Sequence, residues 1–401
     1  MTIIWSVFGV YIFFKKKKKL KYNTEFSIFV IPYLLILLSL FYSTNIEYGL
    51  GMLTKMLSFV IFPLVFYLNR DFFLKKHIYK IFDFFSISVL ILVLFQIVKV
   101  LYNYNFISSS LTLQEIKSNG FISITEIAIE KVEQIKLRRF RNYIIEISNT
   151  HNTYQGLWIC LTIFYLGLKS FISEKKVIKI INAVLIAIFI FWLYLISARM
   201  PFLALVVSLV LVIIIFSEFS LKKKVLVSLI PLLVLIALLS FHNPFSTRAK
   251  EYYNTGFSIL GESSRASEFN SSNVRNGVYY CDIKLIKDAP FFGVGLGDVQ
   301  DKLNDCYQEN INSKVYNWHT YNTHNQYAFF WIASGILGLI SFLALICINF
   351  FNSFKNKNVL LFYLTGITTI VFFSENLLQR SDGVLFYCFF ISLLFFNKLK
   401  I

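Results

Sequence analysis

Long apolar runs recur along this chain and constrain its fold more than any other feature. Several approach the ~20 residues that an α-helix needs to cross the hydrocarbon core of a bilayer. Hydrophobic residues make up 57% of the chain and charged residues 15%, whereas a soluble domain averages roughly 45–50% and ~25%. Hydrocarbon cannot satisfy the backbone hydrogen bonds of an open sheet, so membrane spans of this kind are helices. We therefore expect an all-α, polytopic protein in contact with the lipid bilayer.

The apolar runs predict about 11–12 transmembrane helices. The located spans are 3–14, 26–42, 50–68, 79–101, 151–169, 179–196, 201–217, 225–241, 326–350, 359–375 and 383–396. The first is short, as expected of a partial span or of a chain that lacks an N-terminal piece. Between the eighth and ninth spans lies a large loop. We expect three regions: N-terminal transmembrane helices over 1–241 with a smaller outer loop at 102–150, the large loop at 242–325, and C-terminal transmembrane helices over 326–401.

Lys and Arg gather in alternate connections between the spans. The basic connections are Lys15–Lys21, Arg70–Lys80, Lys169–Lys179, Glu218–Lys224, Lys355–Lys357 and Lys398–Lys400. The large loop 242–325 instead has eight basic against nine acidic residues. The positive-inside rule places the basic connections in the cytoplasm and both long loops outside it. The cluster Lys136–Arg141 fits this topology least well. The net charge of +17 thus gives no reason to expect a nucleic-acid partner.

Both long loops contain sequence that suggests local structure. Apolar residues recur in 102–150 without reaching membrane length, which suggests an amphipathic element along the surface. In the large loop, "NGVYYCDIKLIKDAP" predicts a short helix with Tyr279, Ile283 and Ile286 on one face and Pro290 after its end. Two of the five cysteines, Cys281 and Cys306, also lie there. They are either free thiols or, in an oxidising compartment, a disulfide.

Polar and charged residues on the outer face, at the ends of the spans or in the large loop, are the candidate functional groups, because charge in or near hydrocarbon is costly. They are His151, Tyr154, Arg199, Arg265, Arg275, His324, Asn325, Glu375 and Arg380. Each also has an alternative reading. Arg199 would anchor a short turn by reaching to headgroups, His324 and Asn325 would only start a helix, and Glu375 and Arg380 would pair with each other.

Taken together, these residues favour an anionic lipid substrate. Arginine binds phosphate oxygens with two parallel hydrogen bonds. A neutral imidazole at the same depth accepts a proton from a sugar hydroxyl. No acidic cluster with metal-ligand spacing occurs among these positions, so we expect neither a metal site nor a cofactor.

Three motifs occur in order from about Thr150 onward, most densely over 275–340. They are Ser197-Ala198-Arg199 heading a span; Arg275, Tyr279, Pro290, Gly293 and Gly295 in the large loop; and His324, Asn325, Tyr327, Gly335, Ile336 and Gly338 leading into the next span. In order, spacing and topology, the chain resembles the O-antigen ligase and polymerase family of bacterial envelope enzymes. That family commonly has Trp at the position of Tyr279, which is a mild departure.

The resemblance implies a GT-C-like, metal-independent, inverting glycosyltransferase in the bacterial inner membrane, with its active site on the periplasmic face. The donor would be a glycan on undecaprenyl diphosphate. The acceptor would be the lipid A core for a ligase or a second lipid-linked glycan for a polymerase. A protein O-glycosyltransferase and a transporter of lipid-linked glycans are further alternatives. A transporter would commonly show internal repeats and polar residues near mid-membrane, and neither is found here.

The resemblance also implies roles for individual residues. Arg199 and Arg275 would hold the diphosphate, and His324 would deprotonate the acceptor hydroxyl. The remaining candidates for substrate binding are Asn325, Tyr327, Arg265, His151, Tyr154 and Arg380, of which His151 and Tyr154 resemble a less constant His-x-x-Tyr of some relatives. Arg265 matches no motif.

Overall fold

The computed structural model of the chain describes residues 24–118, 129–240, 244–262 and 268–397, with isolated positions between residues 7 and 15 and between 123 and 127. Every element within these ranges is helical. Most of the first predicted span, 3–14, and the candidate Arg265 lie outside the described residues.

The apolar helices match the predicted spans from the second onward. They are α2 (Thr24–Ser39, continued by η1, Leu40–Tyr42), α3 (Ile46–Met56), α4 (Ser58–Leu68), α5 (Lys75–Tyr102), α9 (Asn152–Ile172), α10 (Lys176–Leu195), α11 (Arg199–Phe216), α12 (Leu221–Ser240), α16 (Gln326–Lys355), α17 (Val359–Val371) and α18 (Ser381–Phe396). Among the described residues, seven helical segments are long and apolar enough to cross a membrane, with α3 and α4 forming one of them, and α17 and α18 are shorter. The protein is therefore a multi-pass, all-helical membrane protein.

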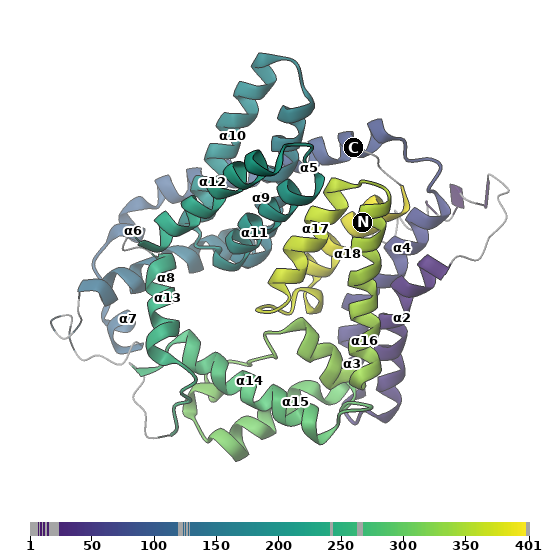
Figure 1. Ribbon diagram of the computed structural model, residues 1–401. Coiled ribbons are helices and arrows are strands. Elements are labelled where there is room, and N and C mark those ends of the chain that lie inside the picture. The colour runs from purple at the N-terminus through teal and green to yellow at the C-terminus, as the bar shows by residue number, and fades with distance from the viewer. Residues whose placement is uncertain are drawn as a thin grey trace.

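Helices α17 and α18 lie side by side between α4 and α11 (Figure 1). Helix α18 packs against α4, α17 against α11, and α16 against α2. Aromatic contacts fill these interfaces, such as the edge-to-face pair of Phe62 in α4 and Phe389 in α18, whose ring centroids are 5.5 Å apart. By contrast, α5 and α10 expose most of their apolar side chains, as expected of helices that face lipid.

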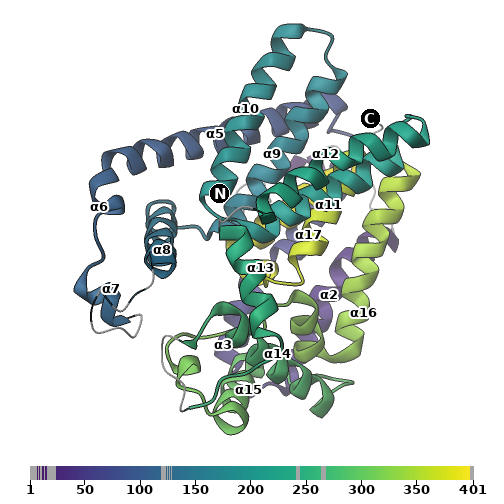
Figure 2. The ribbon, with the colours of Figure 1, turned by 60° about the vertical axis from the view of Figure 1, so that its left-hand side comes forward.

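Shorter helices form the connections at one end of the bundle. The smaller loop contains α6 (Tyr104–Ser108), α7 (Leu113–Ser118) and α8 (Ile129–Ser148), and the large loop contains α13 (Pro244–Thr255), α14 (Ser271–Asp288), η4 (Leu296–Asp298), α15 (Val299–Cys306), the π-helical turn η5 (Tyr307–Ile311) and η6 (Lys314–Asn317). Helices α14 and α15 lie below the bundle in both views, with α8 to one side (Figure 2). We call this the loop end; α9, α11, α16 and α18 all begin there.

Helix α8 is the amphipathic element expected between residues 102 and 150. Its side chains Ile135 and Ile144 are buried. Arg139 on the same helix is also buried. Its guanidinium forms hydrogen bonds of 2.5–2.7 Å with the carboxylate of Glu115 in α7, which compensate for the loss of water. That ion pair holds α7 against α8.

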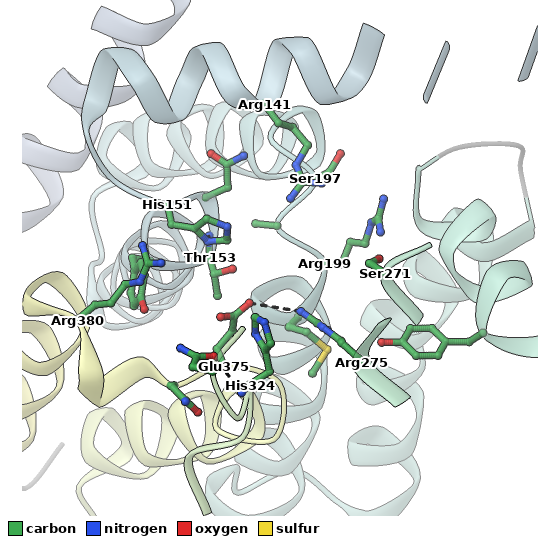
Figure 3. Close-up of a pocket in the computed structure, with 17 residues that line it drawn as sticks. Arg141, His151, Thr153, Ser197, Arg199, Ser271, Arg275, His324, Glu375 and Arg380 are labelled. Atoms are coloured by element: carbon green, nitrogen blue, oxygen red, sulfur yellow. Dashed lines mark hydrogen bonds and ion pairs between the residues drawn. The ribbon is translucent and has the colours of Figure 1, made fainter. Parts of the chain in front are cut away.

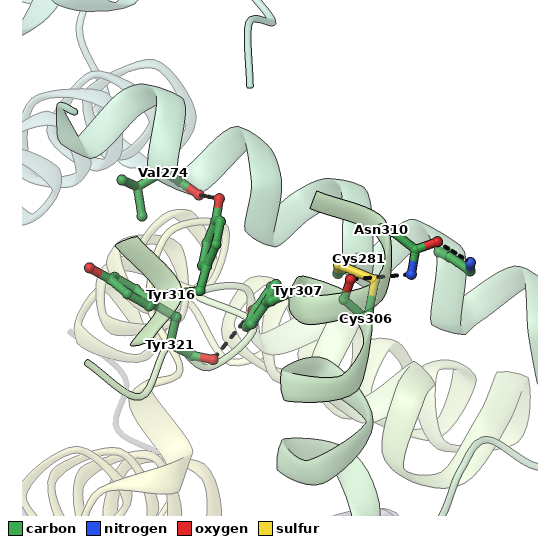
Figure 4. The surroundings of a disulfide bond; sticks show 8 residues. Val274, Cys281, Cys306, Tyr307, Asn310, Tyr316 and Tyr321 are labelled. Atoms are coloured by element: carbon green, nitrogen blue, oxygen red, sulfur yellow. Dashed lines mark hydrogen bonds between the residues drawn. A yellow bond between two sulfur atoms is a disulfide. The ribbon is translucent and has the colours of Figure 1, made fainter. Parts of the chain in front are cut away.

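The predicted helix in the large loop exists as α14, and the face that carries Tyr279, Ile283 and Ile286 is not its buried face. Ile283 is 53% exposed. The buried face instead contains Val274, Val278, Cys281 and Leu285. The structure joins Cys281 to Cys306 of α15 as a disulfide (Figure 4). This crosslink turns the Cys281 side of α14 toward α15, which the greater hydrophobicity of isoleucine could not reveal.

The glycine-rich segment after α14 packs against a kink in α16. The backbone N–H of Val294 donates to the carbonyl of Ile332 at 2.7 Å, and Ile336 donates to Pro290 at 3.0 Å. At the kink, Gly335 has φ +70° and ψ −168°, a conformation that is essentially restricted to glycine. A Cβ at this position would overlap the carbonyl of Phe291. Two of the sequence motifs therefore meet here in a structural role.

The same segment is fixed to the first spans by Asp298. Its carboxylate accepts hydrogen bonds from the backbone N–H groups of Thr44 at 2.9 Å and Asn45 at 2.8 Å. These two residues connect η1 to α3. The large loop is thus held at two places, on α16 and on the connection between the first apolar segments, and this positions α14 over the loop end.

Candidate functional site

A cavity of about 320 Å³ opens at the loop end, between the bundle and helices α13 and α14. Helices α9, α11 and α18 begin at or beside residues that line it, and α16 begins two residues after His324. The N-terminus of a helix has unpaired backbone N–H groups and a partial positive charge. Four such ends around one cavity favour an anionic occupant.

Charged side chains add to the positive potential that these helix N-termini create in the cavity. Arg141 of α8, Arg199 of α11, Arg275 of α14 and Arg380 before α18 line the cavity, together with the carboxylate of Glu375. Figure 3 shows these groups around a common space, with Glu375, Arg275 and His324 near its centre. Four arginines against one carboxylate leave positive charge for an anion to neutralise.

Arg199 is positioned by the tight turn between α10 and α11. Only three residues separate Leu195, the end of α10, from Arg199, the start of α11. Ser197 in this turn has φ +51°, and the backbone N–H of Arg199 donates to the carbonyl of Ser197 at 2.9 Å. The turn fixes the backbone from which the guanidinium extends into the cavity.

Arg275 links the large loop to the bundle through an ion pair. Its guanidinium nitrogen lies 3.6 Å from a carboxylate oxygen of Glu375, with 22% and 17% of the two side chains exposed. The hydroxyl of Tyr252 in α13 also hydrogen-bonds Arg275. Burial raises the pKa of Glu375, while Arg275 and its other arginine neighbours favour the charged form. Glu375 therefore pairs across the cavity with the loop, which differs from the alternative in which it pairs with Arg380.

His324 lies in a turn that several side chains hold in place. Its φ is +47°, a left-handed conformation that costs ~1–2 kcal/mol in a non-glycine residue. The backbone N–H of His324 donates to the side chain of Asn322 at 3.1 Å. The neighbouring Thr323 hydroxyl donates to Asn376 at 3.0 Å. These contacts tie the turn to the segment that includes Glu375, so the imidazole and the carboxylate are positioned together.

The imidazole of His324 lines the cavity in its neutral form. Nδ1 is buried and has no hydrogen-bond partner within the described part of the chain. Burial, then the positive charge of Arg275, then His151 and Arg380, lower the pKa of His324 to about 3. A neutral imidazole that lines a cationic cavity can accept a proton from a bound hydroxyl at its unprotonated ring nitrogen.

His151 occupies a different position at the same cavity. It is the N-cap of α9, and its Nδ1 accepts a hydrogen bond from the backbone N–H of Thr153 at 3.3 Å. Burial, followed by the charges of Arg141, Arg380 and Arg275, lowers the pKa of His151 to about 4. In the neutral ring, Nε2 then bears the proton, so His151 offers a hydrogen-bond donor.

The structure brings together most of the residues singled out from sequence. His324, Arg199, Arg275, His151, Tyr154 and Arg380 all line this cavity. Asn325 and Tyr327 do not. The Asn325 side chain caps α16 by accepting from the N–H groups of Tyr327 and Ala328, and the Tyr327 hydroxyl donates to the carbonyl of Thr369 at 2.9 Å.

Several lining residues were missed from sequence, among them Arg141, Tyr252, Asn322 and Asn376. Only Arg141 left a signal: it belongs to the cluster Lys136–Arg141, which fitted the charge topology least well. The structure accounts for two arginines of this basic cluster. Arg139 pairs with Glu115, and Arg141 lines the cavity. Tyr252 lies in an ordinary polar helix with nothing in its sequence to mark it.

Comparison with known proteins gives two similarities. Residues 183–343 match the family model described as O-antigen ligase, so this stretch, which contains Arg199, Arg275 and His324, confirms the resemblance seen in the motifs. A protein of Haemophilus influenzae, described as uncharacterized, is 25% identical over 204 residues, which are 48% of this chain and 50% of that protein. The chain thus spans about half the length of this curated relative.

Proposed function

Because residues 183–343 match the O-antigen ligase family, we propose that this protein is a glycosyltransferase that moves a glycan from undecaprenyl diphosphate to a hydroxyl of the lipid A core. The reaction would take place on the periplasmic face of the bacterial inner membrane. The observation that supports this most is the cavity itself, which four arginines line together with the neutral imidazole of His324.

The donor diphosphate fits the cationic part of the cavity. Arg199 and Arg275 would grip its oxygens, since guanidinium groups bind phosphate with paired hydrogen bonds. When the sugar C1–O bond breaks, negative charge develops on the diphosphate, and arginines already in place stabilise it without reorganisation. Arg275 is held by its ion pair with Glu375. The incoming anion would compete for that guanidinium, so Glu375 keeps Arg275 positioned until the donor arrives.

His324 is the proposed general base. It would accept the proton of the acceptor hydroxyl as that oxygen attacks C1, and the electron pair of the breaking C1–O bond would leave with the diphosphate. Attack on the face opposite the leaving group inverts the configuration at C1. Burial, and after it the positive charge of Arg275, His151 and Arg380, lowers the pKa of His324 to about 3. A bound diphosphate would offset that charge and raise the pKa, so the base becomes stronger once the donor is bound.

Charge and cysteine chemistry both support the proposed side of the membrane for the site. The loop end bears the long loops, while the short basic connections lie at the other end and favour the cytoplasm. The disulfide between Cys281 and Cys306 suits a loop in an oxidising compartment. Both arguments support the periplasmic face.

The same cavity also suits a polymerase, in which the acceptor is a second lipid-linked glycan, and we keep this as the alternative. A carrier is less well supported, because the charged residues gather at one end of the bundle. A protein hydroxyl as acceptor is the least supported choice, since nothing at the cavity is specific for a peptide.

The glycolipid profile of a deletion strain tests the proposal. For a ligase, long glycan chains on lipid A disappear and lipid-linked polymer accumulates. For a polymerase, a single repeat unit remains on the core. Wild-type protein supplied in trans restores the profile, whereas His324→Ala, present in the membrane at normal level, does not. An unchanged profile in the deletion strain would refute glycan transfer, and substrate trapped on the cytoplasmic side would indicate a carrier.

A further inference from the structure

A second pocket, of about 270 Å³, lies in the large loop outside the arginine-lined cavity. It is lined by residues from the end of α15, the turn η5 and the segment from Tyr316 to Thr320. No lysine, arginine, aspartate or glutamate lines it, and its polar side chains are amides, tyrosine hydroxyls, Thr320 and the imidazole of His319. Its volume lies just below the ~300–1,000 Å³ of typical small-molecule sites. An occupant of this pocket is therefore small and uncharged.

Aromatic rings form the base of this pocket. Tyr307 and Tyr316 are buried and stacked, with ring centroids 4.5 Å apart, and Figure 4 shows them beneath α14. The hydroxyl of Tyr316 donates to the carbonyl of Val274 at 2.9 Å. The hydroxyl of Tyr307 donates to the carbonyl of Tyr321 at 3.3 Å. These bonds fix both rings, so the base is rigid before anything binds.

The rim of the pocket is polar and open to solvent. Trp318 is 46% exposed and meets Phe269 edge to face. Gln308 and Asn317 are exposed, and their side-chain amides make no hydrogen bond to any part of the chain that the structure describes. An amide offers two donors and two acceptor lone pairs. An aromatic surface beside free amides matches a sugar ring, which has apolar C–H faces and hydroxyls at its edge.

The pocket and the arginine-lined cavity are joined by one short segment. Thr320 lines the pocket, Asn322 lines the cavity and His324 follows. Four residue steps span at most ~14 Å even in a fully extended chain. The segment is fixed midway, because Gln300 and Tyr307 both donate to the carbonyl of Tyr321. A glycan whose reacting end lies at His324 can therefore place a sugar farther along its chain in this pocket.

We propose that this pocket is an accessory binding site for a neutral sugar unit of the glycan, with Trp318 as the stacking surface and Gln308 and Asn317 as hydroxyl partners. The proposal rests on the proposed glycan transfer for its biological meaning, but it can be tested by binding alone. The site would hold the growing or transferred chain beside the reacting sugar without taking part in the chemistry.

The test uses the full-length protein in detergent and, as probe, the lipid-free repeat-unit oligosaccharide released by mild acid from the carrier lipid of the source strain. Binding is measured by calorimetry. Trp318→Ala, and separately Gln308→Ala and Asn317→Ala, should each weaken binding by about tenfold. Tyr280→Ala is the matched control, because Tyr280 lies on the same loop and is 45% exposed. Arg275→Ala should still bind the probe, since the probe lacks the diphosphate.

Equal binding by wild type and all three pocket variants, or no binding by wild type, would overturn the proposal. Failure of the proposed function looks different. If wild type transfers no glycan yet binds the probe through Trp318, the accessory site stands and the catalytic proposal falls. With an active enzyme, Trp318→Ala should raise KM for donors of several repeat units and leave kcat unchanged. A fall in kcat with unchanged KM would also contradict an accessory role.

Discussion

At the scale of single residues, the site depends on charged and polar side chains that their surroundings hold in fixed positions. Arg199 extends from a three-residue connection between two helices, and Arg275 is held by Glu375 and Tyr252. His324 is fixed in a left-handed turn beside both. Such preorganisation lets the groups stabilise developing charge without first rearranging. Small changes of side-chain geometry should therefore have large effects on activity.

Replacing Arg199 with Lys tests the geometry of the diphosphate contact. A lysine keeps the charge but loses the planar fork that matches phosphate oxygens. We expect kcat/KM for glycan transfer to fall by about tenfold or more, with the protein present in the membrane at normal level. The matched control is Arg70→Lys, since Arg70 is exposed and lies over the ring of Tyr67. Full activity of the Arg199 variant would show that its charge alone suffices.

The two buried histidines make stability depend on pH. Their pKa values in the fold are about 4 for His151 and about 3 for His324, against 6.5 for an exposed imidazole. Below pH 6.5 the unfolded chain therefore binds protons that the folded chain does not. Stability is complete above pH 6.5 and falls as the pH drops toward 4, by about 1 kcal/mol per pH unit for each histidine.

Thermal unfolding of the detergent-solubilised protein at pH 7.5, 6.5, 5.5 and 5.0 measures this slope. The double variant His151→Asn, His324→Asn should lose less stability over that range than wild type. Equal slopes for the two proteins would show that these histidines are not buried in neutral form.

At the scale of elements, the glycine-rich segment and the kink in α16 form one joint. Gly335 adopts a conformation closed to other residues, and the segment from Pro290 to Val294 bonds to the helix on both sides of it. This joint fixes the large loop, and with it Arg275, against the bundle. Motif residues far apart in the sequence thus serve the site by fixing the loop that covers it.

Gly335→Ala should break this joint. The new Cβ would overlap the carbonyl of Phe291, and the backbone strain adds to the clash, so we expect a loss of about 2 kcal/mol or more. The measurement is thermal unfolding in detergent. Gly167→Ala is the matched control: Gly167 lies within helix α9 with open space around it, so alanine there should be neutral or stabilising. Equal melting temperatures for the two variants would contradict the role of Gly335 in joining the glycine-rich segment to α16.

At the scale of the whole molecule, sequence predicted the bundle well and the loop layer poorly. The spans were readable because apolar length alone decides what crosses a bilayer. Arg199 and His324 could be singled out because a charged or polar residue at the end of a span is costly, and Arg275 through the motif in the large loop. The buried face of α14 was not, since the pairing of Cys281 and Cys306 outweighs hydrophobicity there. Arg141 and Tyr252 were missed because only tertiary packing of α8 and α13 brings them to the cavity.

The disulfide should be measurable as a stabiliser of the loop layer. It joins positions 25 residues apart, and closing a loop of that length contributes about 3 kcal/mol. Cys281→Ser should lower the melting temperature, and a reductant should do the same to wild type but not to the variant.

Counting thiols tests the pairing itself. After denaturation without reductant, three cysteines should react, and all five should react after reduction. Five reactive thiols before reduction would rule out the pairing.

The central claim is that His324 acts as the base in glycan transfer, and a reconstituted reaction tests it most directly. Purified wild type, His324→Ala and the distant control His77→Ala are supplied with an undecaprenyl-diphosphate-linked glycan and lipid A core, and both turnover and donor binding are followed. We predict that His324→Ala binds the donor within a few-fold of wild type but loses transfer, while His77→Ala retains both. Transfer at the wild-type rate by His324→Ala would contradict the account.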